Sequence, residues 1–142
     1  MKRLIIGLLS ATALVAALAC EGTATQSLAG PSTIKDDELS VFSATTEGAT
    51  PLLGFVQVYW FIDLDNDKWP DTNERFQEPL WVEIDRFGEA TTYGYFTPSD
   101  FFGDKDIPES VKMSVRSYLY WSDPTAPYES VTSSKTVKIT AD

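Results

Sequence analysis

The alternation of side chains between residues 55 and 64 constrains the fold of this chain most strongly. One set of alternate positions is entirely apolar: Val56, Val58, Trp60, Ile62 and Leu64. The other set carries aromatic residues: Phe55, Tyr59 and Phe61. A period-two segment with two apolar faces is typical of a strand that is covered on both sides. We therefore predict a central β-strand here, with Trp60 in the core.

Other segments repeat the period-two pattern, whereas helical structure is expected only as one turn at Pro98–Asp104. Strands are predicted at 39–42, 80–84, 90–96, 111–121 and 131–140. Phe87-Gly88 predicts a turn that joins 80–84 and 90–96 as a hairpin. About six or seven short strands separated by turns are typical of an all-β protein with two packed sheets. The expected fold is an antiparallel β-sandwich.

The first twenty residues have the organisation of a secretory leader. Lys2 and Arg3 precede the apolar run Leu4–Ala19, and Cys20 follows it directly. A membrane-spanning helix needs about 20 apolar residues, so this run is short for a span and typical of a signal peptide. The end of the run, Ala17-Leu18-Ala19-Cys20, resembles the lipobox of bacterial lipoproteins. That resemblance implies cleavage before Cys20 and attachment of acyl chains such as palmitate to its thiol.

The lipobox resemblance implies a protein of the bacterial cell envelope. Its partner would be the membrane, to which it would be attached through its N-terminal lipid. Several acyl chains anchor a protein durably, because each buried methylene contributes about 0.8 kcal/mol. Glu21 stands where inner-membrane lipoproteins carry aspartate, which favours the outer membrane, on its periplasmic or surface side. Two alternatives stay open. Cleavage near Ala19 without lipidation would leave Cys20 as a free thiol, and an uncleaved leader would itself be the anchor.

Three regions are expected along the chain: a signal peptide at 1–19, a lipidated cysteine with a flexible tether at 20–32, and a β-sandwich domain at 33–142. The tether is expected because Glu21–Ser32 is rich in small and polar residues and has no apolar period. Fully extended, a tether of this length would reach about 40 Å.

Charge and missing residue types exclude several functions. Loss of Lys2 and Arg3 with the leader leaves 9 of the 11 basic residues against 21 acidic ones, a formal net charge of −12. Such a surface repels nucleic acid, whose binding depends on basic contacts to phosphates. The chain has no histidine, and lipidation consumes its one thiol, so catalysis by either group is excluded. We expect no enzyme, and a small hydrolase with paired carboxylates remains an alternative.

The acidic loop, Asp63–Glu74, has the ligand spacing of a calcium loop. Acidic residues fall at positions 1, 3, 5, 9 and 12, and position 7 offers a backbone carbonyl. Calcium suits this set because it is a hard cation that takes about six to eight oxygen ligands. Lys68 stands at position 6, where glycine is usual, and predicts a left-handed residue at a cost of about 1 kcal/mol. A solvated loop without an ion is the alternative. The expected ligands are Asp63, Asp65, Asp67, the Trp69 carbonyl, Asp71 and Glu74.

The strand, the acidic loop and the expected hairpin together resemble the calcium-stabilised B-type β-sandwich repeats of bacterial surface adhesins. The segments that carry this resemblance are Val58–Leu64, Asp63–Glu74, Leu80–Gly88 and Gly94-Tyr95-Phe96. The resemblance implies an Ig-like or B-type sandwich with bound calcium. It also implies a structural or adhesive role. Another envelope protein is one candidate partner, and a glycan is the other.

Aromatic residues on the faces opposite the expected core indicate an alternative function. Trp81, Tyr118 and Tyr120 occupy these positions in their strands. Exposed Trp and Tyr on a flat sheet can stack on sugar rings, as in carbohydrate-binding modules. A glycan would then be the ligand. The competing interpretation is that a second sheet covers these faces.

Overall fold

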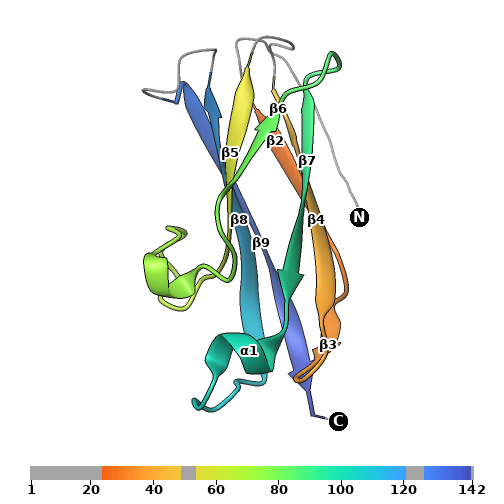
Figure 1. Ribbon diagram of the computed structural model, residues 1–142, viewed down its shortest axis with the longest axis vertical. Coiled ribbons are helices and arrows are strands. Elements are labelled where there is room, and N and C mark those ends of the chain that lie inside the picture. Colours follow the sequence, from red (N-terminus) through yellow and green to blue (C-terminus); the bar gives the residue numbers. More distant parts are fainter. Residues whose placement is uncertain (1–23, 49–53, 121–126, 142) are drawn as a thin grey trace.

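The computed structural model describes residues 24–48, 54–120 and 127–141, and it shows two β-sheets packed face to face (Figure 1). The predicted signal peptide, Cys20 and residue 121 lie outside these ranges. Within them, no helix combines the length and the hydropathy needed to cross a membrane. The predicted all-β sandwich is confirmed.

The smaller sheet has three antiparallel strands in the order β2-β4-β7. They are β2 (Thr25–Ala29), β4 (Ser40–Glu47) and β7 (Glu89–Phe96). The larger sheet has five strands in the order β3-β9-β8-β5-β6. They are β3 (Thr33–Lys35), β9 (Glu129–Thr140), β8 (Ser110–Tyr120), β5 (Phe55–Ile62) and β6 (Leu80–Glu83). Pairing in this sheet is antiparallel except between β3 and β9, which are parallel.

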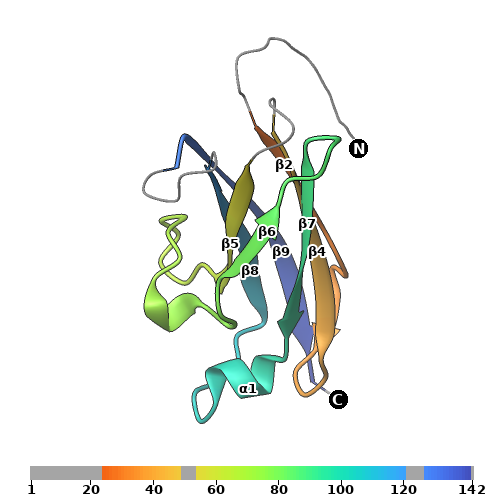
Figure 2. The same ribbon diagram turned by 45° about the horizontal axis from the view of Figure 1, so that its top comes forward.

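Helical structure in the described residues is short. The helix α1 (Pro98–Phe102) follows β7 and confirms the single turn expected there. A 3₁₀ turn, η2 (Thr72–Glu74), lies in the segment between β5 and β6. That segment, residues 63–79, projects beside β5 (Figure 2).

The core lies between the sheets, and Trp60 is at its centre with 1% of its surface exposed. Its indole Nε1 donates a hydrogen bond to Thr92 Oγ1 at 3.1 Å, which satisfies the buried N–H. Gly94 lies so close to this ring that a Cβ atom there would meet the indole at 2.5 Å. The predicted core position of Trp60 is confirmed. Other buried residues of the same core include Phe42, Val58, Ile62, Phe96, Met113 and Val115.

The predicted hairpin of 80–84 with 90–96 is wrong. β6 pairs with β5, and β7 pairs with β4, so the chain passes from one sheet to the other between them. The turn itself is as expected, because the Gly88 N–H donates to the Asp85 carbonyl at 2.9 Å. Period-two alternation identifies a strand but not its partner, and both strands bury a face against the common core.

The structure differs from the flexible tether predicted for 20–32 at residues 25–29, whereas residues 20–23 lie outside the described ranges. Thr25–Ala29 forms β2, which pairs with β4 along its whole length. The Ala24 N–H also donates to the Glu129 carboxylate at 2.6 Å. Residues 25–29 lack a strong apolar period because β2 is an edge strand, held by backbone hydrogen bonds, with Leu28 packed against the core. The described fold therefore includes residues that were expected to be linker.

Candidate functional site

The acidic loop begins and ends beside the same strand. Asp63 directly follows β5, and its N–H donates to the Lys112 carbonyl of β8 at 3.0 Å. After η2 the chain returns to β5, where Arg75 forms an isolated antiparallel bridge with Phe61. This return brings Glu74 next to Asp63, although eleven positions separate them in the sequence.

The two terminal carboxylates organise the loop around themselves. Asp63 is 6% exposed, and it accepts hydrogen bonds from the N–H groups of Asp67 at 3.2 Å and Lys68 at 3.0 Å. Glu74 is 1% exposed, and one of its oxygens accepts from Leu64 N–H at 2.8 Å. Buried carboxylates are costly unless they are hydrogen-bonded or paired with a cation. The loop conformation therefore depends on these two side chains.

Four carboxylates form the acidic cluster: Asp63, Asp65, Asp67 and Glu74. One oxygen from each lies within 4.8 Å of the others, with Asp63 and Glu74 buried and the other two exposed. A hydrogen bond with the Asp67 side chain, desolvation and the negative charges of Asp67 and Glu74 raise the pKa of Asp65 to about 7. The negative charges of Asp67 and Glu74 thus oppose the ionisation of Asp65. An all-oxygen donor set of this charge fits a hard divalent cation.

Of the other two predicted ligands, Asp71 lies outside the acidic cluster. Asp71 caps η2, is exposed, and is absent from the set of mutually close carboxylates. The Trp69 carbonyl accepts a hydrogen bond from the Asp71 N–H at 3.0 Å. The structure therefore brings together positions 1, 3, 5 and 12 of the predicted loop.

Lys68 has the left-handed conformation that its place in the loop predicts. Its φ is 66°, and Asn66 two residues earlier has a φ of 60°. Asparagine tolerates this region, because its short polar side chain can hydrogen-bond locally, whereas a lysine there is strained by about 1 kcal/mol. The turn at Lys68 is what directs its N–H to Asp63.

Two arginines attach the acidic loop to the outer face of the larger sheet. Arg116 of β8 places its guanidinium 4.2 Å from the Trp69 ring centroid. Arg75 lies over the ring of Tyr59 of β5 at 4.8 Å and donates to the Pro70 carbonyl at 2.8 Å. Cation–π contacts of this kind contribute about 0.5–1 kcal/mol each at exposed sites.

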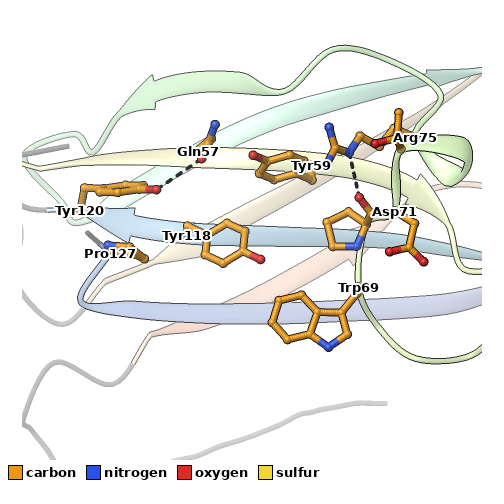
Figure 3. Close-up of a pocket in the computed structure, with 10 residues that line it drawn as sticks. Gln57, Tyr59, Trp69, Asp71, Arg75, Tyr118, Tyr120 and Pro127 are labelled. Atoms are coloured by element: carbon orange, nitrogen blue, oxygen red, sulfur yellow. Dashed lines mark hydrogen bonds between the residues drawn. The ribbon is translucent and has the colours of Figure 1, made fainter. Parts of the chain in front are cut away.

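A groove of about 440 Å³ lies between the attached loop and the sheet, as Figure 3 shows. Rings from β5, β8 and the loop line it, together with a smaller number of polar side chains. Its lining consists of Gln57, Tyr59, Trp69, Pro70, Asp71, Thr72, Arg75, Tyr118, Tyr120 and Pro127. We call it the aromatic groove.

The predicted stacking residues share the outer face of the larger sheet, but they differ in exposure. Trp81 is 53% exposed and packs against Phe55 and Tyr120, with ring centroids at 5.2 and 5.4 Å. Tyr118 is half-buried and lines the aromatic groove, as does the largely buried Tyr120. The smaller sheet packs on the opposite face, against Trp60 and its neighbours.

Among the groove residues that were not predicted as ligand contacts are Tyr59, Arg75 and the indole of Trp69. Tyr59 alternates with Trp60 in β5, so the period-two pattern could have predicted its position on the outer face. No local pattern indicates that Trp69 and Arg75 fold back onto that face, because their partners lie in other strands.

Comparison with known proteins leaves the family of the chain open. No family model and no curated protein matches it. A CARDB domain from Pyrococcus furiosus, solved in complex with di-metal ions, is 10% identical, with 85% of this chain and 96% of that domain covered and a TM-score of 0.48. A β-glucosidase from Listeria innocua is 9% identical over 85% of this chain, with a TM-score of 0.48, and the match covers 16% of the enzyme.

Proposed function

We propose that this chain is a calcium-stabilised β-sandwich protein of the bacterial cell envelope, anchored by lipid at Cys20, with a structural or binding role. The observation that carries the proposal is the acidic cluster at the end of the central strand β5. Its donors are all oxygens, and its charges repel one another without a cation. Calcium accepts such an irregular set of carboxylates more readily than magnesium does.

Calcium would stabilise the fold by joining two distant points of the chain. Asp63 directly follows the end of β5, whereas Glu74 ends η2 just before the chain returns to that strand. An ion between them closes the loop and neutralises carboxylates that are buried in the folded state only. A ligand that binds only the folded state contributes about 2.7 kcal/mol at a hundredfold excess over its Kd.

Thermal unfolding tests the calcium site. We expect a higher melting temperature in millimolar CaCl₂ than in EDTA, and a smaller increase in millimolar MgCl₂. Asp65→Ala should abolish the calcium effect, because it removes one carboxylate of the acidic cluster. Asp104→Ala, which removes an exposed acid outside the loop, should leave it intact. Equal melting temperatures of the unsubstituted protein in CaCl₂ and EDTA would refute the site.

Anchoring through Cys20 would hold the sandwich close to the lipid. The chain is attached to β9 already at Ala24, through the Glu129 carboxylate. Only four peptide units separate Cys20 from Ala24, and their extended length is about 14 Å. The net charge of −12 left after removal of the leader supports lipid rather than headgroup contacts as the means of attachment. The proposed location is the outer membrane, and the charge disfavours nucleic acid as a partner.

We propose a role without catalysis. Asp71 is the carboxylate residue in the lining of the aromatic groove, whereas glycoside hydrolysis generally uses two carboxylates that flank the bond. The acidic cluster holds its carboxylates within 4.8 Å of one another, which suits an ion between them better than a sugar ring. The hydrolase alternative predicts turnover of a glycoside that Asp71→Asn abolishes.

A second candidate function is carbohydrate binding. The observation that favours it is the outer face of the larger sheet, where Trp81, Tyr118 and Tyr120 lie and where no second sheet packs among the described residues. Affinity electrophoresis through gels that contain soluble polysaccharides tests it directly. Retardation by a polysaccharide supports this candidate, whereas unchanged mobility in all gels opposes it.

A further inference from the structure

The aromatic groove is an open depression whose volume and aromatic lining fall within the range of small-molecule sites. Ligand sites are typically concave, about 300–1,000 Å³ in volume, and lined by aromatic side chains with a few polar groups. The groove has a volume of about 440 Å³, and four of its ten lining residues are Tyr or Trp. Figure 3 shows Tyr118 and Trp69 as neighbours along it, with Asp71 near Trp69 and with Gln57 hydrogen-bonded to Tyr120.

We propose that the aromatic groove binds a segment of a neutral oligosaccharide, with a sugar ring on Tyr118 and its neighbour on Trp69. The proposal rests on the carbohydrate-binding candidate and gives it a location. It moves the site from the neighbourhood of Trp81 to the aromatic groove, which Trp81 does not line.

The rings of the groove are held in place before any ligand arrives. The guanidinium of Arg116 lies 4.2 Å from the Trp69 ring centroid and 5.2 Å from that of Tyr118, so it contacts both. Tyr59 meets Tyr118 edge to face at 5.7 Å and carries Arg75 on its ring. A rigid aromatic surface loses little conformational entropy on binding, which favours affinity.

Polar groups of the groove match the hydroxyls of a sugar. The Tyr118 hydroxyl accepts a hydrogen bond from Arg116 Nε at 2.9 Å, which leaves its own proton free to be donated to a ligand. Gln57 and Thr72 offer donors and acceptors, and Asp71 offers acceptors. Sugar hydroxyls both donate and accept, so a mixed set of this kind serves them better than it serves an apolar ligand.

Charge selects a neutral saccharide over an acidic one. Within the groove, the negative Asp71 offsets the positive Arg75. The protein as a whole carries a net charge of −10, or −12 without the leader, and repels polyanions over a Debye length of about 8 Å at physiological salt. An anionic polysaccharide would therefore meet long-range repulsion, opposed locally by Arg75 and by Arg116 beside Trp69 and Tyr118.

Isothermal titration calorimetry in millimolar calcium tests the proposal with four soluble probes. They are cellohexaose, maltohexaose and hexa-N-acetylchitohexaose, which are neutral, and a hexagalacturonate, which is acidic. We expect at least one neutral probe to bind and the acidic one not to bind. Tyr118→Ala and Trp69→Ala should each weaken binding about tenfold or more, the loss of one stacked ring. Tyr118→Phe keeps the ring and should retain most of the affinity.

Tyr93→Ala is the matched control, because Tyr93 is an exposed tyrosine on the smaller sheet. Its affinity should stay within about twofold of that of the unsubstituted protein, since it lies outside the groove. The melting temperature of each variant in calcium shows whether the variant is folded. Tyr118→Phe provides a folded comparison if Tyr118→Ala is not.

The outcomes separate this inference from the functions on which it builds. Absence of binding by all three neutral probes overturns it, as does binding of the hexagalacturonate alone. Undiminished neutral binding in folded Trp69→Ala and Tyr118→Ala variants overturns the groove but leaves carbohydrate binding standing. The calcium proposal is decided by melting temperatures without sugar, so it stands or falls independently.

Discussion

The guanidinium carbon of Arg116 lies 4.2 Å from the ring centroid of Trp69, a residue 47 positions earlier in the sequence. The same guanidinium donates to the hydroxyls of Tyr118 at 2.9 Å and Thr132 at 2.7 Å. It thereby joins the acidic loop to two strands of the larger sheet. One side chain links the proposed calcium site to the proposed sugar site.

Replacement of Arg116 should loosen the loop and disturb the groove together. We expect Arg116→Ala to lower the free energy of unfolding by about 2 kcal/mol, through the lost cation–π contacts and charged hydrogen bonds. Arg116→Lys should recover little of this free energy of unfolding, because an ammonium lacks the flat face of a guanidinium and its planar set of N–H donors. Urea denaturation measures both effects. Full stability of Arg116→Lys would contradict the structural role of the guanidinium.

Lys68 offers a stabilising substitution. Its φ of 66° is unfavourable for a residue with a Cβ atom and ordinary for glycine. Lys68→Gly should raise the free energy of unfolding in calcium by about 0.5–1 kcal/mol, because relief of strain exceeds the added flexibility of the unfolded chain. Lys68→Ala, which keeps a Cβ atom and removes the charge, is the control and should show no such gain. Equal gains in both variants would assign the effect to charge instead of backbone strain.

Trp60 and Trp81 should respond differently to truncation. Trp60 is 1% exposed between the sheets, so Trp60→Ala should cost about 3–5 kcal/mol through lost burial and a cavity. Trp81 is 53% exposed, and Trp81→Ala should cost only about 1 kcal/mol, the loss of its contacts with Phe55 and Tyr120. Chemical denaturation of the two variants makes the comparison. Similar costs at both positions would count against an exposed aromatic platform on the larger sheet.

Cys20 decides the anchoring proposal. Because it is the one cysteine in the chain, Cys20→Ser leaves no thiol for acylation. We expect the variant expressed in a bacterial host to keep its leader and to lack the mass of the acyl chains. Intact mass spectrometry and detergent phase partitioning compare it with the unsubstituted protein. A variant of unchanged processing, with the same retention in the detergent phase, would exclude lipidation at this residue.

Much of the arrangement of the acidic loop could be predicted from the spacing of its acidic residues. Asp63, Asp65, Asp67 and Glu74 were predicted to converge, and the structure places their carboxylates together. The left-handed Lys68 followed from its position in the loop. The loop diverges from the prediction at Asp71, because this residue is the N-cap of η2 and, exposed, lines the aromatic groove.

The sequence by itself determined the all-β class, the central strand β5 and the buried position of Trp60, because alternation of side chains is a local property of a strand. Only the tertiary structure decided that β6 and β7 join different sheets and that Thr25–Ala29 completes one of them. It alone also brought Trp69 and Tyr118 together in the lining of the aromatic groove. The physical reason is that strand pairing and loop docking depend on contacts between residues far apart in the chain. A short-range sequence pattern does not identify which distant residue each one contacts.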